Sequence, residues 1–219
     1  MEKKNGLRLL KIFSLAFTLA LTGAVTPGPV LALVIGQVLA QGLAAAVFIL
    51  LGHAVLELFL LTGLAFGFTR FLRNSRVQAW MGLVGGVVLI WMGQDIFRSA
   101  AGAVLPAGEA AALGWLKLIL AGIGVSLSNP YFTGWWATIG TGQIASLRLR
   151  RKGEYAAFFA GHELGDFAWY MFVAVILTVG RQWLTGDVYT VILKVCGALI
   201  LVLGAVFIGA ALVRLRKNT

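Results

Sequence analysis

Two histidines of this sequence each stand four residues before a carboxylate within a long apolar stretch. His53 precedes Glu57, and His162 precedes Asp166. Residues four apart lie on the same face of an α-helix, so each pair can interact. Because a charge at bilayer depth costs on the order of 3 kcal/mol, carboxylates in spanning helices usually face an interior cavity and carry function. Each pair can form a proton relay, since histidine titrates near neutrality, or a purely structural contact within one helix.

Two short proline motifs predict interruptions in otherwise apolar helices. The first is Thr26-Pro27-Gly28-Pro29 and the second is Ser128-Asn129-Pro130. Proline has no amide hydrogen and opens a helix, and the half-helix that restarts presents free N–H groups and a positive dipole end to an anion. The predicted substrate-binding residues at these breaks are Pro27, Gly28, Pro29, Asn129 and Pro130. The alternative is that the prolines act only as kinks or hinges.

Three more residues near these motifs are candidates to line a cavity. Trp135 and Trp136 follow the second break, and Glu163 precedes Asp166 by three residues. The segment from His162 to Asp166 resembles the start of a zinc-protease motif. That motif requires a second histidine where Asp166 stands, so the sequence argues against an intramembrane metalloenzyme and predicts no enzyme activity and no cofactor.

The composition places these residues in an integral membrane protein. Of 219 residues, 60% are hydrophobic and only 12% are charged, and the mean hydropathy is +0.92. Soluble chains are about 45–50% apolar and about 25% charged, and a particle of this size has too much surface to bury such an excess. A soluble enzyme, a disordered chain and a disulfide scaffold are thereby excluded, the last because Cys196 is the only cysteine.

Six membrane-spanning segments are expected, because a spanning helix needs about 20 mostly apolar residues. Their ranges are 12–35, 43–68, 78–97, 113–142, 156–180 and 190–212. With six spans, 14 of the 18 basic residues, Arg73 and Arg148 among them, fall on one side, so both termini are predicted to be cytoplasmic in the cell membrane. A cleaved signal peptide at residues 1–25 is the alternative for the first span. The net charge is +10, but the basic residues do not form an extended stripe with interleaved aromatic residues. Nucleic-acid binding is therefore not expected.

The two halves of the chain repeat one order of features. A broken helix, a helix with a Gly-His-carboxylate motif and a glycine-rich helix occur in residues 12–97 and again in residues 113–212. Three spans per copy would insert the second copy in the opposite direction. Inverted repeats with broken helices in matching positions are typical of secondary transporters. We therefore expect one all-α transporter domain over residues 1–219, with six helices in two inverted three-helix repeats.

The order of these motifs resembles the LysE/RhtB family of amino-acid exporters. The resemblance lies in Thr26-Pro27-Gly28-Pro29, Gly42, Gly52, Asn129-Pro130, and Asp166 ahead of Trp169-Tyr170. It implies a dimeric six-helix carrier that moves amino acids or similar small solutes outward in exchange for protons. Many members have lysine where this chain has Tyr131, and His53 with Glu57 is not a feature of the well-known amino-acid exporters.

The leading functional hypothesis is proton-coupled export of an amino acid or a related solute. The solute carboxylate would meet the half-helix ends and its ammonium would meet Glu57 or Asp166, while proton exchange occurs at the His53 and His162 pairs. The alternative is export of a divalent heavy metal, as in other members of the wider superfamily, with His53, Glu57, His162 and Asp166 as ligands. A scaffold without transport activity is less favoured, because a scaffold has no need of paired breaks and intramembrane acids.

Overall fold

The computed structural model describes residues 2–72, 74–100 and 113–217, and this part of the chain is entirely helical. Arg73 lies outside the described residues. The α-helices are α1 (Glu2–Ala24), α2 (Pro29–Gln41), α3 (Ala44–Ala65), α4 (Thr69–Leu72), α5 (Ser75–Ser99), α6 (Trp115–Leu127), α7 (Pro130–Trp135), α8 (Thr141–Leu147), α9 (Lys152–Gly180) and α10 (Gly186–Lys217). A π-helix, Trp136–Gly140, joins α7 to α8, and a short 3-10 helix, Arg181–Trp183, follows α9.

Both proline motifs interrupt a helix. The segment expected as one span over 12–35 forms α1 and α2, which are separated by residues 25–28, with Gly28 extended at the N-terminus of α2. The segment expected over 113–142 forms α6, α7 and the π-helix, with Asn129 as the N-cap of α7. Proline occupies the first position of both restarted helices, where its missing amide hydrogen costs nothing.

Five described helical segments are long and apolar enough to cross a membrane, which confirms an all-α membrane protein. They are Asn5–Ala24, Ala44–Ala65, Ser75–Arg98, Lys152–Trp183 and Gly186–Arg216. The apolar helices Pro29–Gln41 and Trp115–Leu127 are shorter than these, because each one adjoins a break.

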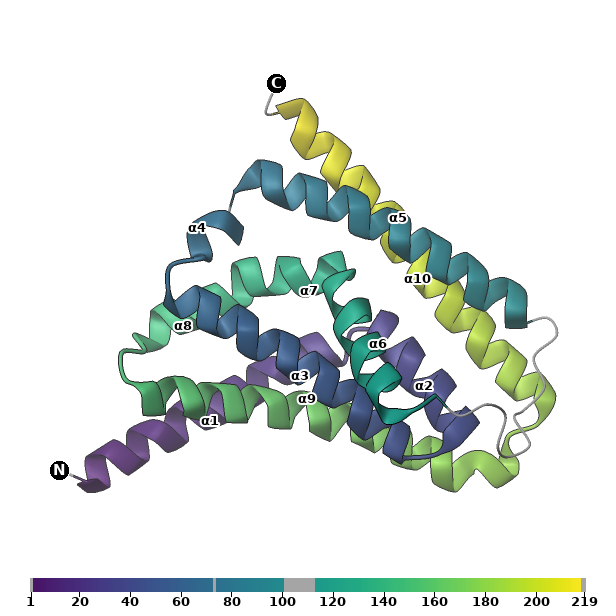
Figure 1. The fold of residues 1–219 in the computed structure, drawn as a ribbon, viewed down its shortest axis with the longest axis horizontal. Helices are drawn as coiled ribbons and strands as arrows, with labels where there is room; N and C mark the ends of the chain where they lie inside the picture. Colours follow the sequence, from purple (N-terminus) through teal and green to yellow (C-terminus); the bar gives the residue numbers. More distant parts are fainter. Residues whose placement is uncertain (1, 73, 101–112, 218–219) are drawn as a thin grey trace.

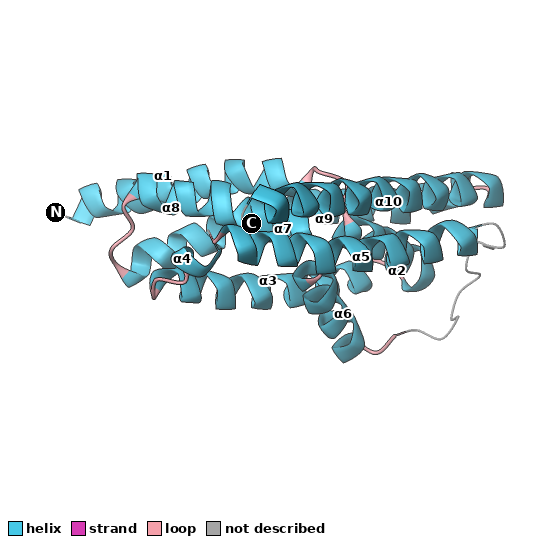
Figure 2. Ribbon diagram, turned by 90° about the horizontal axis from the view of Figure 1, so that it is seen from above, coloured by secondary structure: helices cyan, strands magenta, loops and turns pink. Residues whose placement is uncertain are grey.

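The helices associate in pairs that are distant in the sequence. α5 lies alongside α10 in both views, α1 packs on α9, and α3 packs on α6 (Figures 1 and 2). Glycines permit two of these close approaches: a Cβ atom on Gly52 would collide with the Ile119 carbonyl of α6, and one on Gly161 would collide with the Phe13 carbonyl of α1. Small residues at such crossings are typical of membrane helices, because they let the backbones approach.

The interior contains buried acids, such as Glu57 and Asp166, together with three clusters of buried apolar side chains among the described residues. The two larger clusters lie mainly on α2, α3 and α9 and on α1, α3, α7 and α9. Large apolar side chains are exposed on the outer helices, for example Trp91 of α5 and Val202 of α10. Apolar side chains thus face outward and acids are buried in the interior, which is the arrangement expected of a protein in a bilayer.

Candidate functional site

A small cavity lies where the two helix breaks meet α3 and α9. Its volume is about 50 Å³, which is room for a few water molecules. Five aromatic side chains line it together with both histidines and two carboxylates: Tyr131, Phe132, Trp135, Trp136, Tyr170, His53, His162, Glu57 and Asp166. No lysine or arginine is among the described lining residues, so the charged groups of the cavity favour a cation or an ammonium group.

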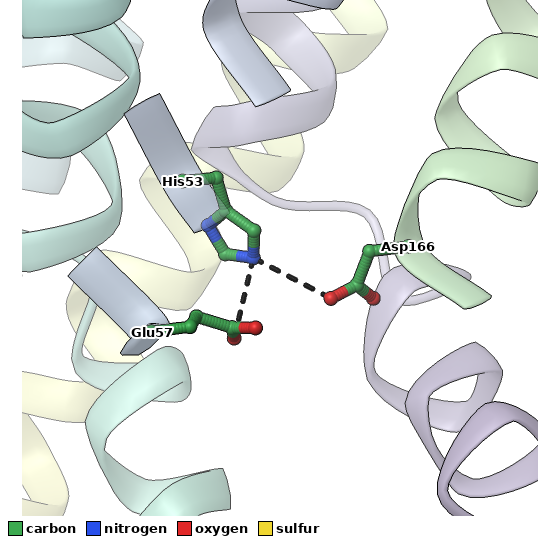
Figure 3. Close-up of side chains that lie close together, drawn as sticks. All are labelled: His53, Glu57 and Asp166. Carbon is green, nitrogen blue, oxygen red and sulfur yellow. Dashed lines mark ion pairs between the residues drawn. The ribbon is translucent and has the colours of Figure 1, made fainter. Parts of the chain in front are cut away.

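The two histidines and two carboxylates form one cluster between α3 and α9. His53 Nε2 lies 3.4 Å from Glu57 Oε1 and 3.6 Å from Asp166 Oδ2 (Figure 3). His162 Nε2 lies 3.2 Å from Glu57 Oε2 and 3.4 Å from Asp166 Oδ2. Each carboxylate therefore lies near both imidazoles, and the cluster joins the two halves of the chain.

Ser126 of α6 determines which nitrogen of His53 carries a proton in the neutral ring. The Ser126 hydroxyl donates to the Gly122 carbonyl at 2.7 Å, and its oxygen lies 2.7 Å from His53 Nδ1. Because the hydroxyl has one hydrogen, and that hydrogen goes to Gly122, the oxygen accepts from Nδ1–H. His53 Nε2 is then left with its lone pair facing Glu57 and Asp166, ready to take a proton or a cation.

Glu57 is the most enclosed member of the cluster, with 2% of its surface exposed. Trp136 donates its indole N–H to Glu57 Oε1 at 3.0 Å. The same indole lies 4.9 Å from the His162 ring, between ring centroids, and Phe158 stacks on that ring at 6.2 Å. These aromatic contacts fix the orientation of His162, whose Nδ1 has no hydrogen-bond partner among the described residues.

The two breaks face each other across the cavity. A Cβ atom built on Gly28 would lie 3.7 Å from Asn129 Nδ2, and Thr26 Oγ1 lies 3.1 Å from the Tyr131 hydroxyl. Asn129 Oδ1 accepts from the Tyr131 backbone amide at 3.0 Å and thus caps α7. By contrast, Gly28 has no side chain to cap α2, so the first amides of α2 remain available at the positive end of its dipole.

The structure brings together most residues that the sequence nominates. Pro27, Gly28, Asn129, Trp135 and Trp136 line the cavity with the four cluster residues. Pro29 and Pro130 begin the restarted helices and are buried outside the described lining. Glu163 is also buried outside the lining, and neither of its carboxyl oxygens has a hydrogen-bond partner among the described residues.

Sequence reasoning missed Ser126, Thr26, Tyr131 and Tyr170 as members of the site. Ser126 carried a usable signal, because it is a polar residue three positions before Asn129 in an apolar helix. Its pairing with His53 depends on the crossing of α3 and α6, which no local pattern reports.

We expect Ser126→Ala to lower transport about tenfold. The change leaves His53 Nδ1–H buried without an acceptor, and such a loss costs about 1–3 kcal/mol. Transport by purified protein in vesicles is the measurement. Ser128→Ala is the matched control and should be neutral, because the Ser128 hydroxyl donates to the Val125 carbonyl in the same helix and has no other hydrogen bond among the described residues. Equal activity of the two variants would contradict a role for the Ser126 hydroxyl.

Comparison with known proteins places the chain in a transporter family. Residues 21–210 match the family model described as LysE type translocator. The chain is 28% identical over 198 residues to the chemotactic transduction protein ChpE of Pseudomonas aeruginosa. The aligned region covers 88% of this chain and 95% of that protein. No solved structure matches the chain. The family consists of translocators rather than enzymes, and its name implies the export of small solutes. The matched range includes both helix breaks and all four cluster residues, and the chain belongs to the LysE type translocator family.

Proposed function

We propose that this protein exports amino acids or related small solutes across the cytoplasmic membrane in exchange for protons. The observation that carries the proposal is the buried cluster of His53, Glu57, His162 and Asp166 on the wall of a cavity between two broken helices. Charged groups are costly inside a membrane protein. A cluster shared between α3 and α9 therefore suits a site where solute and proton compete.

An amino acid has two charged groups that match the two sides of the cavity. Its ammonium group would bind Glu57 and Asp166, and the aromatic rings around them would add cation–π attraction. Its carboxylate would bind the uncapped amides at the start of α2 and the Asn129 amide nitrogen that faces Gly28. The cavity has room for only a few water molecules, so binding of a larger solute would require the helices that carry these residues to separate.

Proton exchange would take place within the cluster itself. A proton on either imidazole is held by two carboxylates, because each Nε2 lies 3.2–3.6 Å from both acids. An incoming ammonium would compete for the same carboxylates and release that proton. Solute and proton would then alternate at the cluster, which is the minimum requirement for antiport.

The proposed architecture is a single domain over residues 1–219 with six spans, as inverted repeats 12–97 and 113–212 and both termini in the cytoplasm. Two contacts support the repeat: α1 packs on α9 and α6 packs on α3, so exchanging the halves exchanges the pairs. Gly52 and Gly161 make the equivalent close approaches. Rocking of one repeat against the other would switch access to the cavity, and the carrier would act as a homodimer.

Export of a divalent heavy metal is the second candidate. Each Nε2 lies 3.2–3.6 Å from the two carboxylates. That spacing is close to the roughly 3.4 Å expected between N and O ligands of a tetrahedral zinc-like ion bound at about 2.1 Å. The Ser126 contact leaves His53 Nε2 free to bind an ion. In this mechanism the metal would be the transported substrate.

Proton movement in everted membrane vesicles separates the two functions. With amino acids and divalent metals added singly, we expect an amino acid to drive proton release. A His53→Gln/His162→Gln variant should lose the coupling to protons in this case. A response only to a divalent metal, abolished by the same double variant, would overturn amino-acid export and favour metal export. No response to either class would contradict both functions.

A further inference from the structure

A second charged feature, which is basic where the cavity is acidic, lies at the start of α9. A cleft of about 360 Å³ is lined by Arg8, Arg148, Arg150, Arg151 and Glu154. It lies where α1 approaches the turn between α8 and α9, at the end of the spanning segment that begins at Lys152. The cleft is separate from the transport cavity and shares no lining residue with it.

The one acid of the cleft already has its partners. Glu154 Oε1 lies 2.6 Å from Arg8 Nε, and Glu154 Oε2 accepts from the backbone amides of Arg150 and Arg151 at 2.8 and 3.2 Å. Arg8 Nη2 also donates to the Leu147 and Arg148 carbonyls at 3.3 and 3.4 Å. Glu154 and Arg8 thus neutralise each other within the lining of the cleft.

Three guanidinium groups remain without a carboxylate. Among the described residues, Arg8 alone of the four arginines forms an ion pair, so Arg148, Arg150 and Arg151 carry uncompensated charge around one cleft. The positive end of the α9 dipole adds to their field, since α9 begins at Lys152. Guanidinium groups bind phosphate oxygens in bidentate fashion, so this cluster of arginines suits a phosphate anion.

We propose that this cleft binds the phosphate diester of an anionic membrane lipid. A lipid is favoured over a free phosphate for two reasons. The cleft lies at the end of a membrane-spanning helix, where headgroups are concentrated and basic clusters attract anionic lipids. In addition, Leu7 and Leu10 of α1 are 62% and 61% exposed, so the helix that contributes Arg8 also offers apolar surface to acyl chains.

Lipid retention by the full-length protein tests the proposal. Purified protein is exchanged into nanodiscs of phosphatidylcholine with a minor fraction of phosphatidylglycerol, and the bound lipids are counted by native mass spectrometry. Phosphatidylglycerol should be enriched on the native chain. An Arg148→Gln/Arg150→Gln/Arg151→Gln variant should bind it on the order of 100-fold more weakly, since each basic residue contributes about one kcal/mol at a membrane surface.

A charge-matched variant separates a site from general attraction. Arg70→Gln/Arg76→Gln/Arg214→Gln removes three charges outside the cleft and should retain the enrichment. Equal loss in both variants, or loss in neither, would overturn the proposal. Displacement of the lipid by millimolar glycerophosphate or inorganic phosphate would assign the cleft to a free phosphate and also overturn it. If the triple variant does not fold, Arg148→Gln alone should still show a measurable loss.

Discussion

Asp166→Asn should abolish solute-driven proton release, with a decrease of at least about 100-fold, while the protein still folds and inserts into the membrane. Asparagine keeps the volume of the side chain and removes its charge. Asp166 Oδ2 lies 3.6 Å from His53 Nε2 and 3.4 Å from His162 Nε2. The variant therefore removes one of the two carboxylates that can hold a proton on either imidazole, while the volume of the side chain is kept.

Glu57→Gln is the companion test on the other helix. The glutamine carbonyl can still accept the Trp136 indole N–H, which bonds to Glu57 Oε1 at 3.0 Å. Local packing should therefore persist while the charge is lost, and transport should fall as strongly as in Asp166→Asn. Initial rates in everted vesicles, normalised to folded protein measured by size-exclusion chromatography, are the readout.

A control for both variants is Asp187→Asn, because Asp187 is exposed at the start of α10. It should transport at the native rate. Full transport by both Asp166→Asn and Glu57→Gln would contradict any substrate or proton role for the cluster. Loss of transport in one variant alone would show that only one of the two carboxylates is required for transport.

The helix breaks could be predicted from the sequence because proline acts locally. Pro29 and Pro130 begin α2 and α7 in the structure, as the loss of an amide hydrogen dictates. Hydropathy locates the spans over 12–35 and 113–142, but it does not report the breaks that the proline motifs predict within them. It measures the apolar length of a segment, and that length is the same whether the helix is continuous or interrupted.

The contacts between helices could not be predicted in the same way. The sequence nominates His53–Glu57 and His162–Asp166 because a helix places residues four apart on one face. The structure adds the crossed contacts, His162 to Glu57 at 3.2 Å and His53 to Asp166 at 3.6 Å. These contacts depend on how α3 and α9 are rotated toward each other, which is a property of tertiary packing.

The crossing of α3 and α6 determines the position of His53. A change at this crossing should lower the stability of the protein. We expect Gly52→Ala to destabilise the protein by about 1–3 kcal/mol or more. A Cβ at Gly52 would collide with the Ile119 backbone carbonyl, and backbone cannot rotate away as a side chain can. The helices would have to separate, which would also pull His53 from Ser126. The unfolding midpoint in detergent should fall, and transport should fall with it.

Gly122 and Gly124 turn this prediction into a test of the crossing itself. Gly122 faces the Ile49 carbonyl across the same contact, so Gly122→Ala should be similarly destabilising. The double variant should cost less than the two single costs added, because one separation of α3 from α6 makes room for both methyl groups. A methyl group on Gly124 would meet no atom of another helix within 4 Å, so Gly124→Ala should be neutral or should stabilise α6 by up to about 1 kcal/mol. Full additivity of the first two changes, or a cost at Gly124 equal to that at Gly52, would contradict the close approach of α3 and α6 and, with it, the placement of His53 against Ser126.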